Sequence, residues 1–137
     1  MQTNKVKHAV KIFDYIHSLD SEKLAKKISE EQKKNDLNPK IFIQINLGLE
    51  SQKSGIVKEN LVNFYNFCKN LDLNIVGIMC IPPFDEDSSK YFSEMSKLCK
   101  SIDKNELSMG MSSDYLSAIE FSSTFLRIGS NIFGKRS

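Results

Sequence analysis

Short apolar segments with the character of β-strands alternate along this chain with longer amphipathic segments, and the connections between them are short. Such alternation is typical of a parallel sheet whose strands are joined by helices. The segment Ile75–Ile81 is nearly all apolar, as expected for a strand covered on both faces. We therefore predict an α/β fold with strands at Phe13–Leu19, Ile41–Asn46, Ile75–Ile81, Glu106–Ser108 and Thr124–Arg127.

The segments between these strands have the character of helices. Val57, Leu61, Phe64, Tyr65 and Cys68 recur at the spacing that places side chains on one face of a helix. Asp20 and Ser21 are residue types that cap helix N-termini. We predict helices that begin at Asp20 or Ser21, at about Val57, at about Ser88 and at Asp114, the last three ending near Asn70, Ile102 and Phe121.

Composition excludes several classes of protein. The 137 residues carry a net charge of +2, too small to indicate binding to nucleic acid or to an anionic membrane. No stretch approaches the roughly 20 apolar residues of a membrane span, and the N-terminus lacks the apolar core of a signal peptide. Cys68, Cys80 and Cys99 predict reduced core thiols in a cytoplasmic protein. His8 and His17 do not stand at metal-ligand spacing with any cysteine.

Two Gly/Ser clusters near the end of the chain indicate a phosphate site. Each follows a short apolar run, and Met111–Ser113 and Gly129–Asn131 are their centres. Consecutive N–H groups flanked by hydroxyls bind anions well, and a (β/α)₈ barrel commonly holds a phosphate on its last two loops. Arg127 adds a positive charge at the end of the last strand. A Gly/Ser turn can also be plain helix capping, so both interpretations stay open at this point.

The same residues carry a family resemblance. The motifs are Leu107-Ser-Met-Gly-Met-Ser-x-Asp114, Arg127-Ile-Gly-Ser130, Ile132-Phe-Gly-Lys-Arg136, Gln44-Ile-Asn46, Gln52-Lys-Ser-Gly55, Gly77-Ile-Met79 with Pro82, and Gln2-Thr-Asn-Lys5. Taken in their order along the chain, and over nearly its whole length, they resemble the pyridoxal phosphate homeostasis proteins. That family has the single-domain PLP-binding barrel of the alanine racemase N-terminal domain, where PLP is pyridoxal 5'-phosphate.

The resemblance implies a cofactor site and a role for each of its residues. Ser112, Gly129 and Ser130 would hold the PLP phosphate together with Met111, and Ser130 stands where the family more often has Thr. Arg127 would lie near the pyridine nitrogen. The implied function is PLP homeostasis, meaning storage or delivery of the cofactor without a defined reaction. The resemblance therefore implies a PLP-binding protein and not an enzyme in the ordinary sense. From its residue type alone, Arg127 could instead pair with a carboxylate at the barrel mouth.

The strand count sets this chain apart from a full barrel. The roughly five strands predicted here cannot close a (β/α)₈ barrel, because such a barrel needs eight. By the resemblance, residues 1–137 correspond to the last five strands, so we predict a partial TIM-type barrel, a single incomplete domain whose first three strands are missing. The family's Schiff-base lysine belongs to the missing first strand, so PLP would bind non-covalently at best. We also expect Ile43, Ile45 and Ile78 to face the barrel interior and to be under-covered.

Further residues are candidates for the same rim. Asn46, Glu50, Lys53 and Ser54 follow the second strand, at the end of a barrel where function concentrates. Lys53 and Lys5 are the only lysines expected near the cavity, and either could equally be a solvated surface lysine.

Rival interpretations remain open at this stage. Ser108 lacks the G-x-S-x-G elbow of many hydrolases, and neither histidine is expected to reach it. One alternative is a non-binding fragment, or a split subunit that pairs with a chain supplying the missing strands. Another is an α/β enzyme that uses the same loops for a different phosphorylated metabolite, such as a sugar phosphate.

Overall fold

Five parallel strands form one strongly curved sheet in the order β1-β2-β3-β4-β5. The computed structural model describes residues 5–48, 54–83 and 86–127. The strands are β1 (Tyr15–Leu19), β2 (Lys40–Ile45), β3 (Asn74–Cys80), β4 (Glu106–Met111) and β5 (Phe125–Arg127). The prediction of a partial (β/α) barrel is confirmed, with β1 starting two residues later than expected and β4 extending three residues further.

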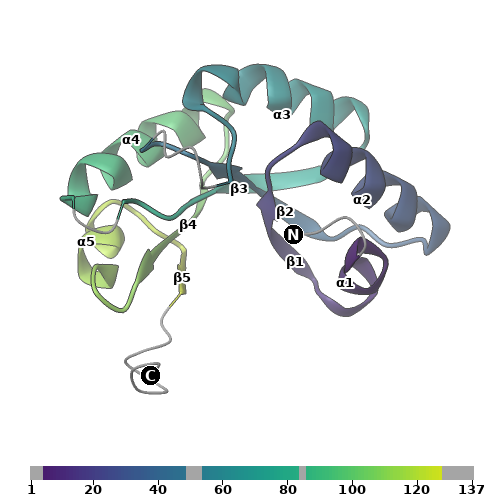
Figure 1. The fold of residues 1–137 in the computed structure, drawn as a ribbon, viewed down its shortest axis with the longest axis horizontal. Coiled ribbons are helices and arrows are strands. Elements are labelled where there is room, and N and C mark those ends of the chain that lie inside the picture. The colour runs from purple at the N-terminus through teal and green to yellow at the C-terminus, as the bar shows by residue number, and fades with distance from the viewer. Residues whose placement is uncertain (1–4, 49–53, 84–85, 128–137) are drawn as a thin grey trace.

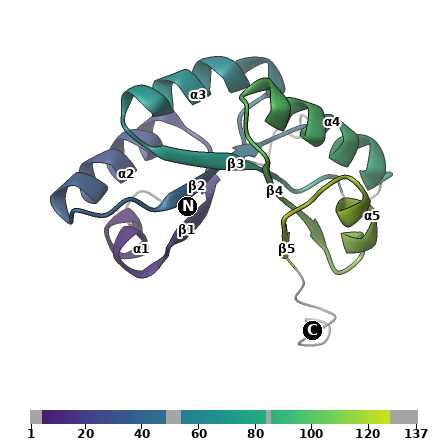
Figure 2. The same ribbon diagram turned by 180° about the vertical axis from the view of Figure 1, so that it is seen from behind.

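Helices follow the strands and cover the outer, convex side of the sheet (Figures 1 and 2). They are α1 (Val6–Ile12), α2 (Glu22–Lys34), a 3₁₀ turn η2 (Lys58–Asn60), α3 (Leu61–Asn70), α4 (Ser88–Ser101) and α5 (Tyr115–Glu120). Ser21 caps α2 through its side chain, which accepts a hydrogen bond from the Leu24 N–H, as its residue type predicts. Sequence analysis missed α1. None of the described helices is long and apolar enough to cross a membrane.

The main core lies between the sheet and the helices. Ile43, Ile45 and Ile78 belong to it, with exposed fractions of 0%, 2% and 0%. The expectation that these three isoleucines face an under-covered barrel interior is therefore wrong. Alternate residues of a strand point to opposite faces, and in these strands the isoleucines occupy the face that packs against the helices.

The concave face has its own packing, built from rings of distant strands. The Tyr15 and Phe125 ring centroids lie 5.1 Å apart, although β1 and β5 are the two ends of the sheet. The His17 ring stacks on Phe42 at 4.4 Å and meets Phe125 edge-on at 5.3 Å. We call Tyr15, His17, Phe42 and Phe125 the inner ring cluster. It shows that the sheet curls far enough for its two ends to touch through side chains.

A bulge interrupts the pairing of β4 with β5. Ser108 is paired with Phe125 and Met111 with Arg127, so three steps along β4 match two along β5, which is the mark of an extra residue. Gly110 lies in this bulge at φ +104°. A Cβ there would come within 2.7 Å of the Ala118 Cβ, so both the backbone conformation and the space require glycine.

Candidate functional site

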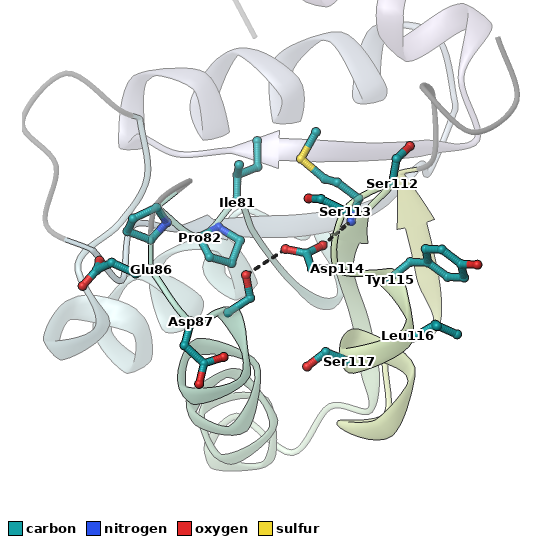
Figure 3. A pocket seen from close by; sticks show the side chains of 13 residues that line it. Ile81, Pro82, Glu86, Asp87, Ser112, Ser113, Asp114, Tyr115, Leu116 and Ser117 are labelled. Carbon is teal, nitrogen blue, oxygen red and sulfur yellow. Dashed lines mark hydrogen bonds between the residues drawn. The ribbon is translucent and has the colours of Figure 1, made fainter. Parts of the chain in front are cut away.

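The carboxyl end of β4 continues into a tight turn that runs from Met111 to Asp114. The Asp114 carboxylate accepts a hydrogen bond from the Met111 N–H at 2.7 Å, and the Asp114 N–H donates to the Met111 carbonyl at 3.1 Å. The second Asp114 oxygen accepts from the Ser88 hydroxyl at 2.8 Å (Figure 3). The Met111 N–H therefore already donates a hydrogen bond within the turn. Within the predicted anion-binding segment Met111–Ser113, the candidate residues are then Ser112 and Ser113.

A pocket of about 740 Å³ lies between this turn and the loop that follows β3. Its lining includes three carboxyl groups, from Glu86, Asp87 and Asp114. A hydrogen bond from Tyr91 lowers the pKa of Glu86, and the Ser89 N–H lowers the pKa of Asp87. Because these two groups are anionic at neutral pH, the pocket suits a phosphate poorly.

Ser112 and Ser113 also line this pocket. In Figure 3 the Ser112 side chain points away from the Asp114 carboxylate. The register of the two strands sets Arg127 of β5 opposite Met111 of β4. Two of the five predicted site positions thus lie on neighbouring strand ends, next to Ser112. Gly129 and Ser130 lie outside the described residues.

The end of β2 contributes a second part of the same rim. The Asn46 N–H donates to the Ile56 carbonyl at 3.0 Å, and the Ile56 N–H donates to the Gln44 carbonyl at 2.8 Å. The Gln44 side chain also donates to the Ser54 carbonyl at 3.1 Å. Ser54 and Ile56 therefore lie back against the end of β2, close to Asn46, as predicted. Glu50 and Lys53 lie outside the described residues.

Sequence analysis missed a polar contact on the concave face. His17 Nδ1 lies 2.7 Å from Ser108 Oγ, so the expectation that neither histidine reaches Ser108 is wrong. The curl of the sheet brings β1 and β4 together, which spacing along the chain could not reveal. Ser108 is still a poor candidate for the nucleophile of a hydrolase, because its side chain is 0% exposed and a buried hydroxyl cannot meet a substrate.

The cysteines are core residues, as predicted. Cys68, Cys80 and Cys99 are buried and free. Burial raises the pKa of Cys68 to about 12 and that of Cys99 to about 11, and burial together with Asp114 raises the pKa of Cys80 to about 12. Thiols in this state are poor nucleophiles. Among the described residues, no group of three or more His, Cys, Asp or Glu side chains could hold a metal ion.

Comparison with known proteins decides the family. The model of the alanine racemase N-terminal domain matches residues 1–137. The chain belongs to this family. Its similar relatives include the pyridoxal phosphate homeostasis proteins of Aquifex aeolicus and Helicobacter pylori, at 36% and 37% identity over 99% and 97% of this chain.

A solved structure of the same kind confirms the fold. PipY of Synechococcus elongatus with PLP bound superimposes with a TM-score of 0.89 at 29% identity, over 98% of this chain and 67% of that chain. The chain spans 64% and 63% of the length of the two curated relatives. The half-barrel described here therefore corresponds to less than two thirds of those family members.

Proposed function

We propose that this chain binds PLP non-covalently and serves PLP homeostasis by storing or delivering the cofactor in the cytoplasm. The observation that carries the proposal is the register of β4 with β5, which pairs Met111 with Arg127 at one end of the sheet. The relatives named for PLP homeostasis and the PLP-bound state of PipY support it. No reaction is part of the proposal.

The phosphate is assigned to the side of the β4 turn that faces β5. Ser112 supplies donors there, and Gly129 and Ser130 complete the cradle in the next loop. Ser112 and Ser113 also line the acidic pocket, and its carboxylates at Glu86 and Asp87 would repel a phosphate, so we place the phosphate against the part of the turn nearest β5. Asp114 acts only on the turn, because its two oxygens accept from Met111 and Ser88.

Arg127 is proposed to lie against the pyridine nitrogen. PLP, when bound, supplies an electron sink for reactions of amino acids. A guanidinium does not release its proton at ordinary pH, so Arg127 would leave the nitrogen unprotonated and weaken that sink. This choice of residue favours holding the cofactor over catalysis.

The positions of the described lysines support non-covalent binding. Lys40 is the first residue of β2, at the amino end of the sheet, and its Nζ lies over the Tyr15 ring at 5.2 Å. Lys5 is exposed at the start of α1. Neither is the buried position in which a lysine amine attacks an aldehyde.

A titration with three ligands tests the proposal. PLP should bind with 1:1 stoichiometry, inorganic phosphate should compete, and pyridoxal, which lacks the phosphate, should bind at least about tenfold more weakly. Arg127→Ala and Gly129→Asp should each weaken PLP binding, the latter by placing a carboxylate against the anion. Preference for a sugar phosphate over PLP, or unchanged affinity in both variants, would refute the assignment.

A second candidate role concerns assembly, and two open sheet edges favour it. Within the described residues, β1 pairs only with β2 and β5 only with β4. Leu116 and Ile119 of α5, which follows β4, are 65% and 50% exposed. We propose residues 1–137 as a single incomplete domain that associates with a polypeptide supplying three further βα units. Sedimentation of the chain with and without that polypeptide tests this, and a monodisperse, cooperatively melting monomer that ignores it would refute it.

A further inference from the structure

The contact between His17 and Ser108 joins two strands that are not neighbours. His17 belongs to β1 and Ser108 to β4, and β2 and β3 lie between them in the sheet. The 2.7 Å separation of Nδ1 and Oγ is a short hydrogen-bond distance. Such a bond spans the concave face, so it forms only when the sheet is curled enough to bring β1 next to β4.

Packing holds both partners of this bond in place. Ser108 is completely buried, so its hydroxyl depends on protein partners for hydrogen bonding. The His17 ring is stacked on Phe42 with an interplanar angle of 17°, and Phe125 meets it at 72°. The imidazole is thus fixed by two rings from other strands while its Nδ1 faces β4.

The strand register connects this bond to the proposed phosphate site. Ser108 and Phe125 form one paired rung of β4 and β5, and Met111 and Arg127 form the next. The bulge between the two rungs is braced, because the Ser123 hydroxyl donates to the Met109 carbonyl at 2.6 Å. Ser108 and Phe125 therefore lie within three residues of the ends of their strands.

We propose that His17 is a positioning residue for the phosphate site. By fixing Ser108 and Phe125, it sets where the ends of β4 and β5 lie relative to each other, and so the shape of the cradle around Ser112. It acts through Ser108 and Phe125 and does not touch the ligand. This inference rests on the proposed function, and it adds a residue on β1 to a site otherwise formed by β4 and β5.

Two substitutions separate the hydrogen bond from the ring packing. His17→Phe keeps a ring on Phe42 and loses the bond, whereas His17→Asn keeps a polar group near the Nδ1 position and loses the ring. Ser108→Ala removes the bond from the other side. His8→Phe is the matched control, because His8 is exposed on α1. Affinity for PLP and thermal melting are measured for each variant.

The positioning role predicts a distinct pattern. His17→Phe and Ser108→Ala should each weaken PLP binding by about tenfold, and the double variant should bind no more weakly than either one. His17→Asn should restore affinity to within about threefold of wild type even if it melts lower. His8→Phe should match wild type. Affinity that simply follows melting temperature across the series would overturn the inference.

A ligand-free readout keeps the test independent of PLP binding. Amide exchange at residues 109–114 should change in the His17→Phe chain without any ligand and return toward wild type in His17→Asn. If wild type fails to bind PLP, the proposed function fails, and this exchange measurement still decides whether His17 sets the rim. Unchanged exchange in His17→Phe would overturn the inference while leaving the proposed function intact.

Discussion

The Ser88 hydroxyl donates a hydrogen bond of 2.8 Å to Asp114 and thereby ties the first residue of α4 to the turn after β4. The other Asp114 oxygen accepts from the Met111 N–H. The carboxyl group at this edge of the barrel is therefore used to hold a loop in shape. Neighbouring carboxyl groups of Glu86 and Asp87 make the adjoining pocket acidic.

Removing this carboxylate should loosen the turn. Asp114→Ala leaves the Met111 N–H and the Ser88 hydroxyl without their acceptor, so we expect the free energy of unfolding to fall by about 1–3 kcal/mol. PLP affinity should fall with it, while Asp114→Asn, which keeps one acceptor oxygen, should lose less. Urea denaturation and PLP titration measure both effects. Glu120→Ala, an exposed change on α5, is the control, and equal losses in Asp114→Ala and Glu120→Ala would contradict this account.

Filling the β4 bulge should destabilise the sheet edge. In Gly110→Ala the new methyl group meets Ala118 and Leu126 at 2.7 Å and 2.9 Å, at a positive φ. Overpacking of this kind costs about 1–3 kcal/mol, and we expect a lower melting temperature together with weaker PLP binding. Lys97→Ala on the exposed face of α4 should change neither. A Gly110→Ala chain with the melting temperature of wild type would show that the bulge does not require glycine at this position.

The buried thiols give a pH dependence with a definite sign. The pKa values of Cys68 and Cys80 are raised to about 12 in the fold, so the unfolded chain loses these protons first as the pH rises. Stability should therefore fall above about pH 9, by up to roughly 1.4 kcal/mol per pH unit for each thiol. Urea midpoints across this range measure the effect. At about pH 8 the native thiols should resist a thiol reagent until urea is added, and rapid labelling of the folded chain would contradict their burial.

Non-covalent binding predicts a diffuse labelling pattern. Borohydride reduces any link between PLP and a lysine to a stable product, which peptide mass spectrometry then locates. With PLP at stoichiometric amounts, we expect only scattered, low-level labelling, because none of the described lysines is buried. A single dominant pyridoxyl-lysine, at Lys5 or Lys53 above all, would reveal a relocated covalent site.

The order of strands and the main helices could be predicted from sequence because local periodicity and caps such as Ser21 encode them. The sequence did not show which face of each strand packs against the helices. Strands such as Ile75–Ile81 are apolar on both faces, so their pattern does not separate the outside of a barrel from its inside. For that reason the sequence pattern did not show which side of the sheet Ile43 faces. Helix α1, in contrast, could have been predicted, because Val6, Ala9 and Val10 recur at helical spacing, and all three are buried.

The candidate site, like the fold, contains features that the sequence could predict and features that it could not. Residues joined by local sequence, such as the turn from Met111 to Asp114, were predicted near their observed place. The bond between His17 and Ser108 spans 91 residues and depends on how far the sheet curls. Curvature is a collective property of all five strands and their bulges, so no single segment encodes it.

Hydrogen–deuterium exchange of the chain with and without PLP tests the central claim most directly, because it locates the ligand along the backbone. The account predicts that PLP slows exchange in peptides covering residues 108–115 and 125–133. Peptides at the amino ends of the strands, such as one around Lys40, should be unchanged. Protection confined to the acidic pocket side at residues 81–88, or no protection at saturating PLP, would contradict the account.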